Sequence, residues 1–167
     1  GRIIYPANYI FNGTLGAAQW TTDPAWCLLD LLTSERYGCG EFIKLNQLDV
    51  YSFYAASVYC SELVTFNDRL GTGAIQQITE PRFSLNVNIQ TRQDVFKVVN
   101  SLCSVFMAMP LYTSGSISLI QDKAGLDPSF LFTEANVTEE GFSYSGSSSK
   151  TRATVIIVKY FDLELIF

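Results

Sequence analysis

The segment that most constrains the fold is DPAWCLLDLLTSERYGCGEF, residues 23–42, which combines a helix start, an apolar helical face and a glycine-rich corner. Asp23 can cap the free backbone amides of a first turn, and Pro24 suits the first helical position because its missing N–H would have no partner there. Gly38 and Gly40 supply the backbone freedom that commonly ends a helix. The segment therefore predicts an amphipathic helix that packs on a core and ends in a sharp turn. Its expected buried residues, spaced i, i+3, i+4 and i+7, are Ala25, Leu28, Leu29 and Leu32.

Two further helices are predicted from the spacing of apolar residues. The first runs from about residue 48 to residue 63 behind the cap Asn46, and the second follows the cap Thr91. The first has an expected buried face that is rich in tyrosine. Its buried positions are predicted to be Tyr51, Tyr54, Ala55, Val58, Tyr59 and Leu63. Those of the second are predicted to be Val95, Val98, Val99, Leu102, Cys103 and Phe106.

From residue 82 the spacing of apolar residues changes to two, which is the period of a strand. Apolar and polar side chains alternate over residues 82–90, and this predicts a half-buried strand. Residues 65–81 contain Asn67, Gly71, Gly73 and Pro81 and are predicted to be a loop. The apolar members of the strand are Phe83, Leu85, Val87 and Ile89.

The C-terminal half predicts further strands. Ser114-Gly115 is expected to turn a hairpin between residues 111–112 and 117–120. The run 154–160 is β-branched on both faces, as is typical of a covered central strand.

These elements predict an α+β fold of two small, closely packed subdomains. Residues 1–80 would form a helical subdomain with an N-terminal strand. Residues 81–167 would form a β-α-β-β unit with a late central strand. Because the first residue is Gly, we expect the chain to be an internal fragment of a longer protein.

The side chains offer little catalytic chemistry. The chain contains no histidine, which removes the commonest general base and the Ser-His and Cys-His nucleophile pairs. Neither a phosphate-binding glycine loop nor a G-x-S-x-G elbow occurs. The four cysteines are widely spaced and form no C-x-x-C pair, which favours buried thiols over a zinc site. We therefore expect no catalytic residues, no metal and no cofactor. The cysteines are Cys27, Cys39, Cys60 and Cys103.

Charge and composition exclude two further classes of partner. The net charge is −5, and the 11 Lys and Arg residues form no cluster, so direct binding of nucleic acid is not expected. No apolar run approaches the roughly 20 residues that span a bilayer, so stable membrane insertion is not expected either. Aromatic residues make up 14% of the chain, and they would suit either a core or a large protein–protein interface.

The opening segment resembles the motif N-P-A-W-x-x-x-D-L-L-T-x-x-R-Y-G-x-G of the tail tip attachment proteins of long-tailed phages, also called host specificity protein J. YPANY (5–9) and FNGT (11–14) resemble the P-x-N-Y and D-G-T elements of that family. The stretch from EPRF at residue 80 to QDK at residue 123 resembles its strand, helix and hairpin. LFTEANV…KTRATVIIVKYFD (131–162) is similar to its late strand pair. Asp23 stands where the family usually has Asn.

The resemblance implies a structural role in a hub. The family's central region looks like the hub domains of phage baseplates and tail spikes, where three copies form a ring that closes the tail tube and carries receptor-binding parts. It implies a homotrimer in the parent protein, tail tip and tail tube proteins as partners, a place in the virion, and DNA passing through the ring. The residues that carry the structural motif are Pro24, Trp26, Tyr37, Gly38, Gly40, Pro81, Arg82, Phe83 and Arg152.

Alternatives remain open at this point. A receptor- or glycan-binding module is suggested by the many Tyr and Asn residues, and a cell-wall hydrolase is a third hypothesis. Trp26 could serve the core or an interface. Arg36, Arg82 and Arg152 are expected to make structural hydrogen bonds. The acidity could repel DNA along a ring lumen, or keep an aromatic-rich surface in solution.

Overall fold

The computed structural model describes residues 11–17, 19–69, 75–125, 130–138, 140–148, 152–155 and 157. The chain divides into two units, residues 1–123 and 124–167. The described part of the first unit contains three α-helices and two antiparallel two-stranded sheets, which confirms the α+β class. In the second unit the described residues form neither helix nor strand. The expected subdomain boundary between residues 80 and 81 stays a prediction about the assembled protein.

Helix α1 (Pro24–Thr33) begins and packs as the sequence predicts. The Asp23 carboxylate accepts hydrogen bonds from the backbone N–H groups of Ala25 at 2.9 Å and Trp26 at 3.2 Å, and Pro24 occupies the first turn. This is the expected cap, which satisfies amides that have no partner inside the helix. All four residues of the predicted apolar face are buried, and so is Trp26.

Helix α2 (Val50–Ser61) differs from its prediction in both its cap and its buried face. A 3₁₀ turn, η1 (Leu45–Gln47), occupies the expected start, and Asp49 rather than Asn46 caps the helix. The predicted tyrosine-rich face is wrong, because Tyr51 is 57% exposed and Val58 is 45% exposed. Both faces carry apolar residues, and the face that packs on the core carries one large side chain, Phe53, among three small ones. The buried residues are Phe53, Ala56, Ser57 and Cys60.

Helix α3 (Val95–Val105) is capped by Asp94 rather than Thr91, with the Lys97 N–H donating to the Asp94 carboxylate at 3.2 Å. Four of its predicted core positions are buried, Val98 is half-buried, and Val95 is 53% exposed. Because the helix begins at Val95, that residue lies in the first turn, at the edge of the core. The four buried residues are Val99, Leu102, Cys103 and Phe106.

The hairpin of β3 (Ala108–Thr113) and β4 (Ser116–Gln121) is confirmed. Its strands are antiparallel with Tyr112 opposite Ile117. The turn residues Ser114 and Gly115 have φ angles of 52° and 81°, the left-handed backbone that two-residue hairpin turns require.

The other hairpin overturns two predictions. Strands β1 (Leu63–Arg69) and β2 (Ile75–Pro81) pair antiparallel across much of the predicted loop 65–81. Residues 82–90, predicted as a strand, lie outside any strand and leave Val87 and Ile89 exposed. Their alternation is real, but among the described residues no neighbouring strand is placed to complete a ladder. A backbone hydrogen bond from Leu85 N–H to the Thr22 carbonyl, 2.7 Å long, ties this segment to α1.

The late strand is also not found where the structure is described. Thr154, Val155 and Ile157 have no strand pairing. Residues 156 and 158–160 of that prediction lie outside the described residues, as does the segment 1–10 that would hold the N-terminal strand.

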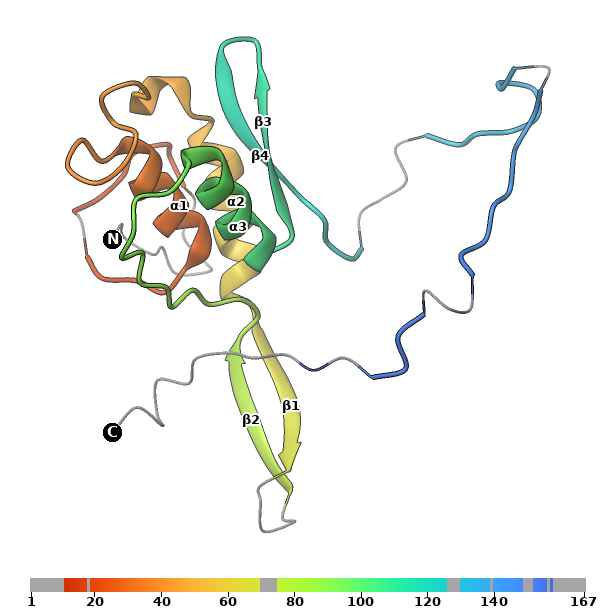
Figure 1. Ribbon diagram of the computed structural model, residues 1–167, viewed down its shortest axis with the longest axis horizontal. Helices are drawn as coiled ribbons and strands as arrows, with labels where there is room; N and C mark the ends of the chain where they lie inside the picture. The colour runs from red at the N-terminus through yellow and green to blue at the C-terminus, as the bar shows by residue number, and fades with distance from the viewer. Residues whose placement is uncertain are drawn as a thin grey trace. The chain divides into compact units, whose positions relative to one another are not determined.

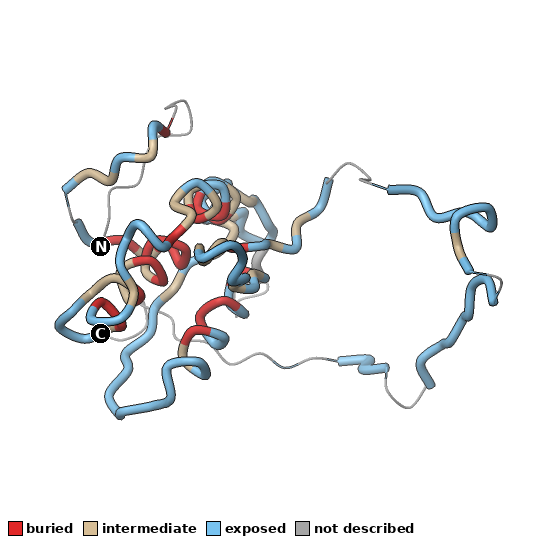
Figure 2. The backbone as a smooth tube through the Cα atoms, turned by 90° about the horizontal axis from the view of Figure 1, so that it is seen from above, coloured by how far each residue is buried: buried red, intermediate tan, exposed pale blue. Residues whose placement is uncertain are grey.

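One core joins the three helices of the first unit. Figure 1 shows α1, α2 and α3 together with the β3–β4 hairpin beside them, while β1–β2 extends away from the helices. The buried residues lie mostly on the helices (Figure 2). In the described part of the chain, no helix is long and apolar enough to cross a membrane.

Candidate functional site

Trp26 lies in the core of this chain. Its side chain is fully buried, and its ring lies 6.3 Å from that of Phe11. Phe11 in turn stacks on Tyr54 at 4.7 Å and meets the edge of Tyr51 at 5.4 Å. The indole N–H of Trp26 has no hydrogen-bond partner among the described residues. The tryptophan therefore anchors the first turn of α1 through aromatic packing.

A buried polar network links the start of α1 to the end of α2. The second carboxylate oxygen of Asp23 accepts hydrogen bonds from the Ser57 hydroxyl at 2.7 Å and the Ser61 hydroxyl at 3.2 Å. The Asp23 N–H donates to the Thr21 hydroxyl at 3.0 Å. Burial raises the pKa of Asp23 because it removes water from the charged form, although these hydrogen bonds act in the opposite direction. The network therefore holds one carboxyl group between two helices.

Sequence reasoning identified Asp23 only as a cap and missed this network. A signal was present in Ser57 and Ser61, which lie four residues apart and so on the same face of α2. Their partner came from a different helix, 34 and 38 residues earlier in the chain. Such a distant pairing cannot be predicted from local spacing.

The Tyr37-Gly38-Cys39-Gly40 corner folds back onto the end of α1. The Cys39 N–H donates to the Leu31 carbonyl at 3.0 Å, and the N–H groups of Gly38 and Gly40 donate to the Ser34 carbonyl at 3.1 and 3.0 Å. A Cβ atom at Gly38 would lie 1.8 Å from the Leu31 carbonyl oxygen, and one at Gly40 would lie 2.4 Å from that of Thr33. Neither glycine has a positive φ. Close backbone approach, rather than the predicted conformational freedom, therefore requires glycine here.

Tyr37 faces outward from this corner. Its ring is 64% exposed, and its hydroxyl donates a hydrogen bond to the Asp30 carboxylate one turn from the end of α1. A shallow cavity of about 500 Å³ adjoins the ring. Its lining includes Leu31, Val95, Val98 and the segment 89–93.

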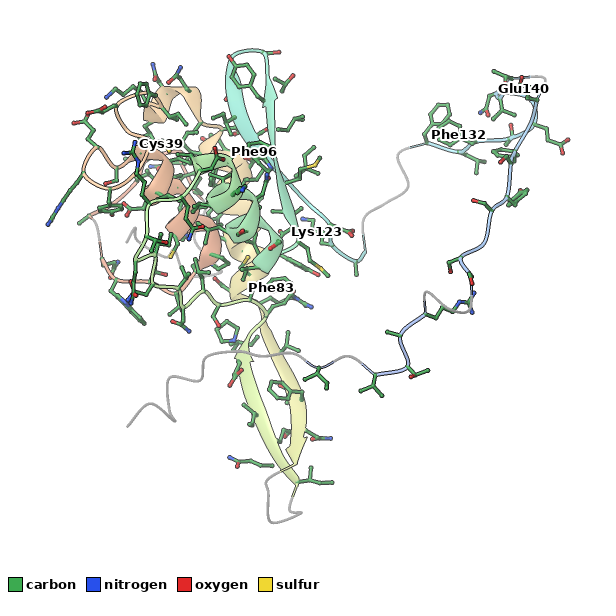
Figure 3. All side chains as sticks on the ribbon, viewed as in Figure 1. Cys39, Phe83, Phe96, Lys123, Phe132 and Glu140 are labelled. Carbon is green, nitrogen blue, oxygen red and sulfur yellow. The ribbon has the colours of Figure 1, made fainter. Side chains whose placement is uncertain are left out.

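Pro81, Arg82 and Phe83 form the base of the β1–β2 hairpin. Arg82 donates to the Glu62 carboxylate from Nη2 at 2.7 Å and from Nε at 3.2 Å, and its guanidinium lies 4.5 Å from the centre of the Tyr59 ring. The hydrogen bond to Glu62 raises the pKa of Arg82. Phe83, labelled in Figure 3, lies where β2 leaves the helices, with its ring 6.2 Å from that of Tyr59. The hairpin therefore emerges directly from the last turn of α2.

The predicted motif residues do not gather in one place. Pro24 and Trp26 follow Asp23, whose carboxylate accepts hydrogen bonds from Ser57 and Ser61 of α2. The hairpin base follows directly after the end of α2. The corner residues lie at the opposite end of α1. Arg152 is an exposed residue of the second unit. The motif residues of the first unit therefore lie at three separate junctions: the start of α1, the corner after α1 and the base of the β1–β2 hairpin.

The cysteines are free thiols, three of them buried and Cys27 half-buried. Burial raises the pKa of Cys60 to about 12 and that of Cys103 to about 11, which opposes formation of a reactive thiolate. Within the described ranges, no group of three or more Cys, Asp or Glu residues is placed to hold a metal ion.

Many large apolar side chains are exposed on the surface. On the β1–β2 hairpin, Leu63 is 67%, Ile75 66% and Phe66 44% exposed. In the second unit, seven large apolar residues are exposed and are not covered by any described residue. These are Phe130, Leu131, Phe132, Phe142, Tyr144, Val155 and Ile157.

Comparison with known proteins identifies where such a segment occurs. No protein-family model matches the chain. It is 36% identical over 152 residues to tip attachment protein J of Escherichia phage SECphi27, and 28% identical over 158 residues to tip attachment protein J of Escherichia phage SECphi4. These matches cover 91% and 93% of this chain but only 12% and 13% of the two relatives. Because the similarity extends over nearly the whole chain in both, the chain corresponds to a segment, about an eighth of the length, of phage tail tip attachment proteins J.

Proposed function

We propose that this segment is a structural part of a phage tail tip, a hub module that helps form a ring closing the tail tube and supporting receptor-binding parts. The observation that carries this proposal is the exposed apolar surface of the β1–β2 hairpin and of the second unit. Phe66 lies on one face of the hairpin and Leu63 and Ile75 on the other, so both faces present apolar side chains that are suited to protein–protein contact. A module that is buried among neighbours in a tail tip would need such a surface.

The placement of the acidic side chains supports a structural role. Asp23, Asp49 and Asp94 cap the three α-helices. Glu62 pairs with Arg82, and Glu35 pairs with Lys44 at 2.7 Å. These carboxylates hold elements together, whereas a hydrolase of the glycosidase type would direct two of them across a cleft.

In the assembled ring we expect three copies in contact with other tail tip and tail tube proteins, within the virion. DNA leaving the capsid would pass through the ring without binding this segment directly. The net charge of −5 would oppose adhesion of phosphate groups to a ring wall.

The test introduces Phe66→Glu into the parent protein and uses that variant to complement a phage that lacks the parent protein. Phe66 is exposed on β1, so the change should leave folding intact while placing a charge in the proposed contact. A hub role predicts that assembled tails are lost, as counted by electron microscopy. Tyr112→Glu, at a residue of β3 that is 72% exposed, is the matched control. Normal particles carrying Phe66→Glu would contradict the hub role.

One observation favours a second candidate, a glycan- or receptor-binding module. The cavity beside Tyr37 combines an exposed aromatic ring with the polar side chains of Gln90, Arg92 and Gln93, and sugar sites use this combination. The test is a glycan array with the purified chain and with Tyr37→Ala. Binding that is lost in the variant would support this function, and in virions the same change would impair adsorption without reducing particle number.

A further inference from the structure

The β1–β2 hairpin is a sheet with two open edges. Among the described residues it contains only these two strands, and neither pairs with a third. Phe66 lies opposite Ile78 at its centre, and Val64 shares their face. A two-stranded hairpin is marginally stable by itself in water, and open edges pair readily with another strand. The hairpin is therefore suited to accept an additional strand.

The second unit contains a segment suited to supply that strand. Residues 152–157 have the sequence RATVII, whose β-branched side chains are typical of a strand covered on both faces. Instead, Val155 is 76% exposed and Ile157 is 86% exposed, and neither has a strand partner among the described residues. The sequence is therefore typical of a covered strand, whereas its side chains are exposed. Addition to a sheet would cover them.

Charge favours the same pairing. Residues 141–160 contain three basic residues, one of them Arg152, and no Asp or Glu. Residues 1–123, the unit that carries the hairpin, contain ten acidic and eight basic residues, a net charge of −2. A basic apolar strand would therefore approach a unit with a small net negative charge, and complementary charge of this kind guides association and register.

Ring symmetry indicates which copy supplies the strand. A ring of three identical copies needs two different, complementary surfaces on each copy, because every contact joins one surface to the other. The hairpin and residues 152–157 are two such surfaces. We propose that residues 152–157 of one copy add as a third strand to the β1–β2 hairpin of a neighbouring copy. This inference rests on the proposed hub function, for which it names the contact between copies.

The test uses two variants of this chain that each break one surface. Phe66→Glu places a charge on the accepting hairpin, and Val155→Glu places one on the donated strand. Mass in solution is measured by light scattering over a concentration series, with circular dichroism as the check of folding. Tyr112→Glu and Val87→Glu are matched controls, because both residues are exposed and lie outside the proposed contact. Ile157→Glu replaces Val155→Glu if that variant fails to fold.

We expect trimers for the unmodified chain and both controls, and monomers for each contact variant by itself. An equimolar mixture of the two contact variants should form a complex of one copy of each, because one intact hairpin and one intact strand remain. A trimer that survives both contact substitutions would overturn strand addition and leave the hub proposal standing. A monomeric unmodified chain would also overturn it. In that case, faster amide exchange of the hairpin in Val155→Glu would indicate pairing within one copy.

Discussion

The two hairpins have the same secondary structure but different attachments. In β3–β4, the Leu119 side chain is buried, its N–H donates to the Ser52 hydroxyl of α2 at 2.9 Å, and the Ile117 carbonyl accepts from the Asp49 N–H at 2.8 Å. In β1–β2, the contacts with the helices lie at the base, where the N–H groups of Arg82 and Phe83 donate to carbonyls at the end of α2. One hairpin is therefore part of the core, and the other is a projection.

The anchored hairpin is therefore expected to affect the stability of the fold, and the projecting hairpin is expected to affect contacts with other chains. On the anchored hairpin, the buried Leu119 side chain contributes to the free energy of unfolding. Leu63, Phe66 and Ile75 on the projecting hairpin are exposed, so their burial can contribute only when another chain or segment covers them. Paired substitutions in the two hairpins can therefore distinguish the two roles.

The largest contrast is expected between two leucines. Leu119→Ala should lower the free energy of unfolding by about 2–5 kcal/mol, because it removes buried methyl groups and leaves a cavity. Leu63→Ala, at a residue of β1 that is 67% exposed, should change it by no more than about 0.5 kcal/mol. Urea denaturation of the two variants measures both values. Similar losses in the two variants would mean that the projecting hairpin is also covered in the free chain.

Hydrogen bonds should show a smaller contrast of the same kind. Ser52→Ala leaves the partly buried N–H of Leu119 without its acceptor, at a cost of about 1–3 kcal/mol. Thr65→Ala removes the exposed contact between the Thr65 and Thr79 hydroxyls, 3.0 Å apart, at a cost of roughly 0.2–1 kcal/mol. Thermal unfolding of both variants checks the order. A larger loss of stability in Thr65→Ala than in Ser52→Ala would contradict the view that only β3–β4 is anchored to the core.

The third prediction concerns pH and the helices that support β3–β4. Because burial raises the pKa of Asp23 in the folded state, the folded chain holds that proton more tightly than the unfolded chain. The stability from this group is therefore present at low pH, and is lost as pH rises from the ordinary aspartate value of about 3.9 through the raised value. In Asp23→Asn, the free energy of unfolding should fall less as pH rises through this range. Urea denaturation across this pH range measures it, with Asp94→Asn, at the exposed cap of α3, as the control.

The smallest effect is expected at the hairpin base. Arg82→Gln removes the pair with Glu62, which is partly exposed and therefore screened by salt. Global unfolding should hardly change, while the amides of β1–β2 should exchange faster at low salt and no faster at high salt. Lys44→Gln removes a comparable exposed pair with Glu35, far from this hairpin in the sequence. Equal effects of the two variants on β1–β2 exchange would rule out a local role for Arg82.

The two hairpins also differ in how well they could be predicted. Ser114-Gly115 is a short turn signal between two apolar runs, so β3–β4 could be placed from sequence. The strands β1 and β2 are largely polar and are joined through a glycine-containing stretch, so the same residues were predicted as a loop. The regular alternation over 82–90 produced the opposite error, because alternation indicates a face but cannot provide a partner strand.

The candidate site was predicted in part for similar reasons. The order of motifs from residue 5 to residue 162 was enough to identify the family, since motif identity and spacing are properties of the chain itself. The network of Asp23 with Ser57 and Ser61 was missed, because it joins two helices that are distant in sequence. The cavity beside Tyr37 was missed too, since it lies between α1, α3 and residues 89–93.

The sequence by itself determined the α+β class, the start of α1, the β3–β4 turn and the family. Each depends on local chemistry: a cap and a proline, a turn dipeptide, or a run of motif residues. Tertiary structure decided which face of α2 is buried, why Gly38 must be glycine, and which hairpin is anchored. These depend on side-chain volume and on neighbours that arrive from elsewhere in the chain. A Cβ atom at Gly38 is excluded only because the Leu31 carbonyl already occupies that space, and no local pattern of residues records that.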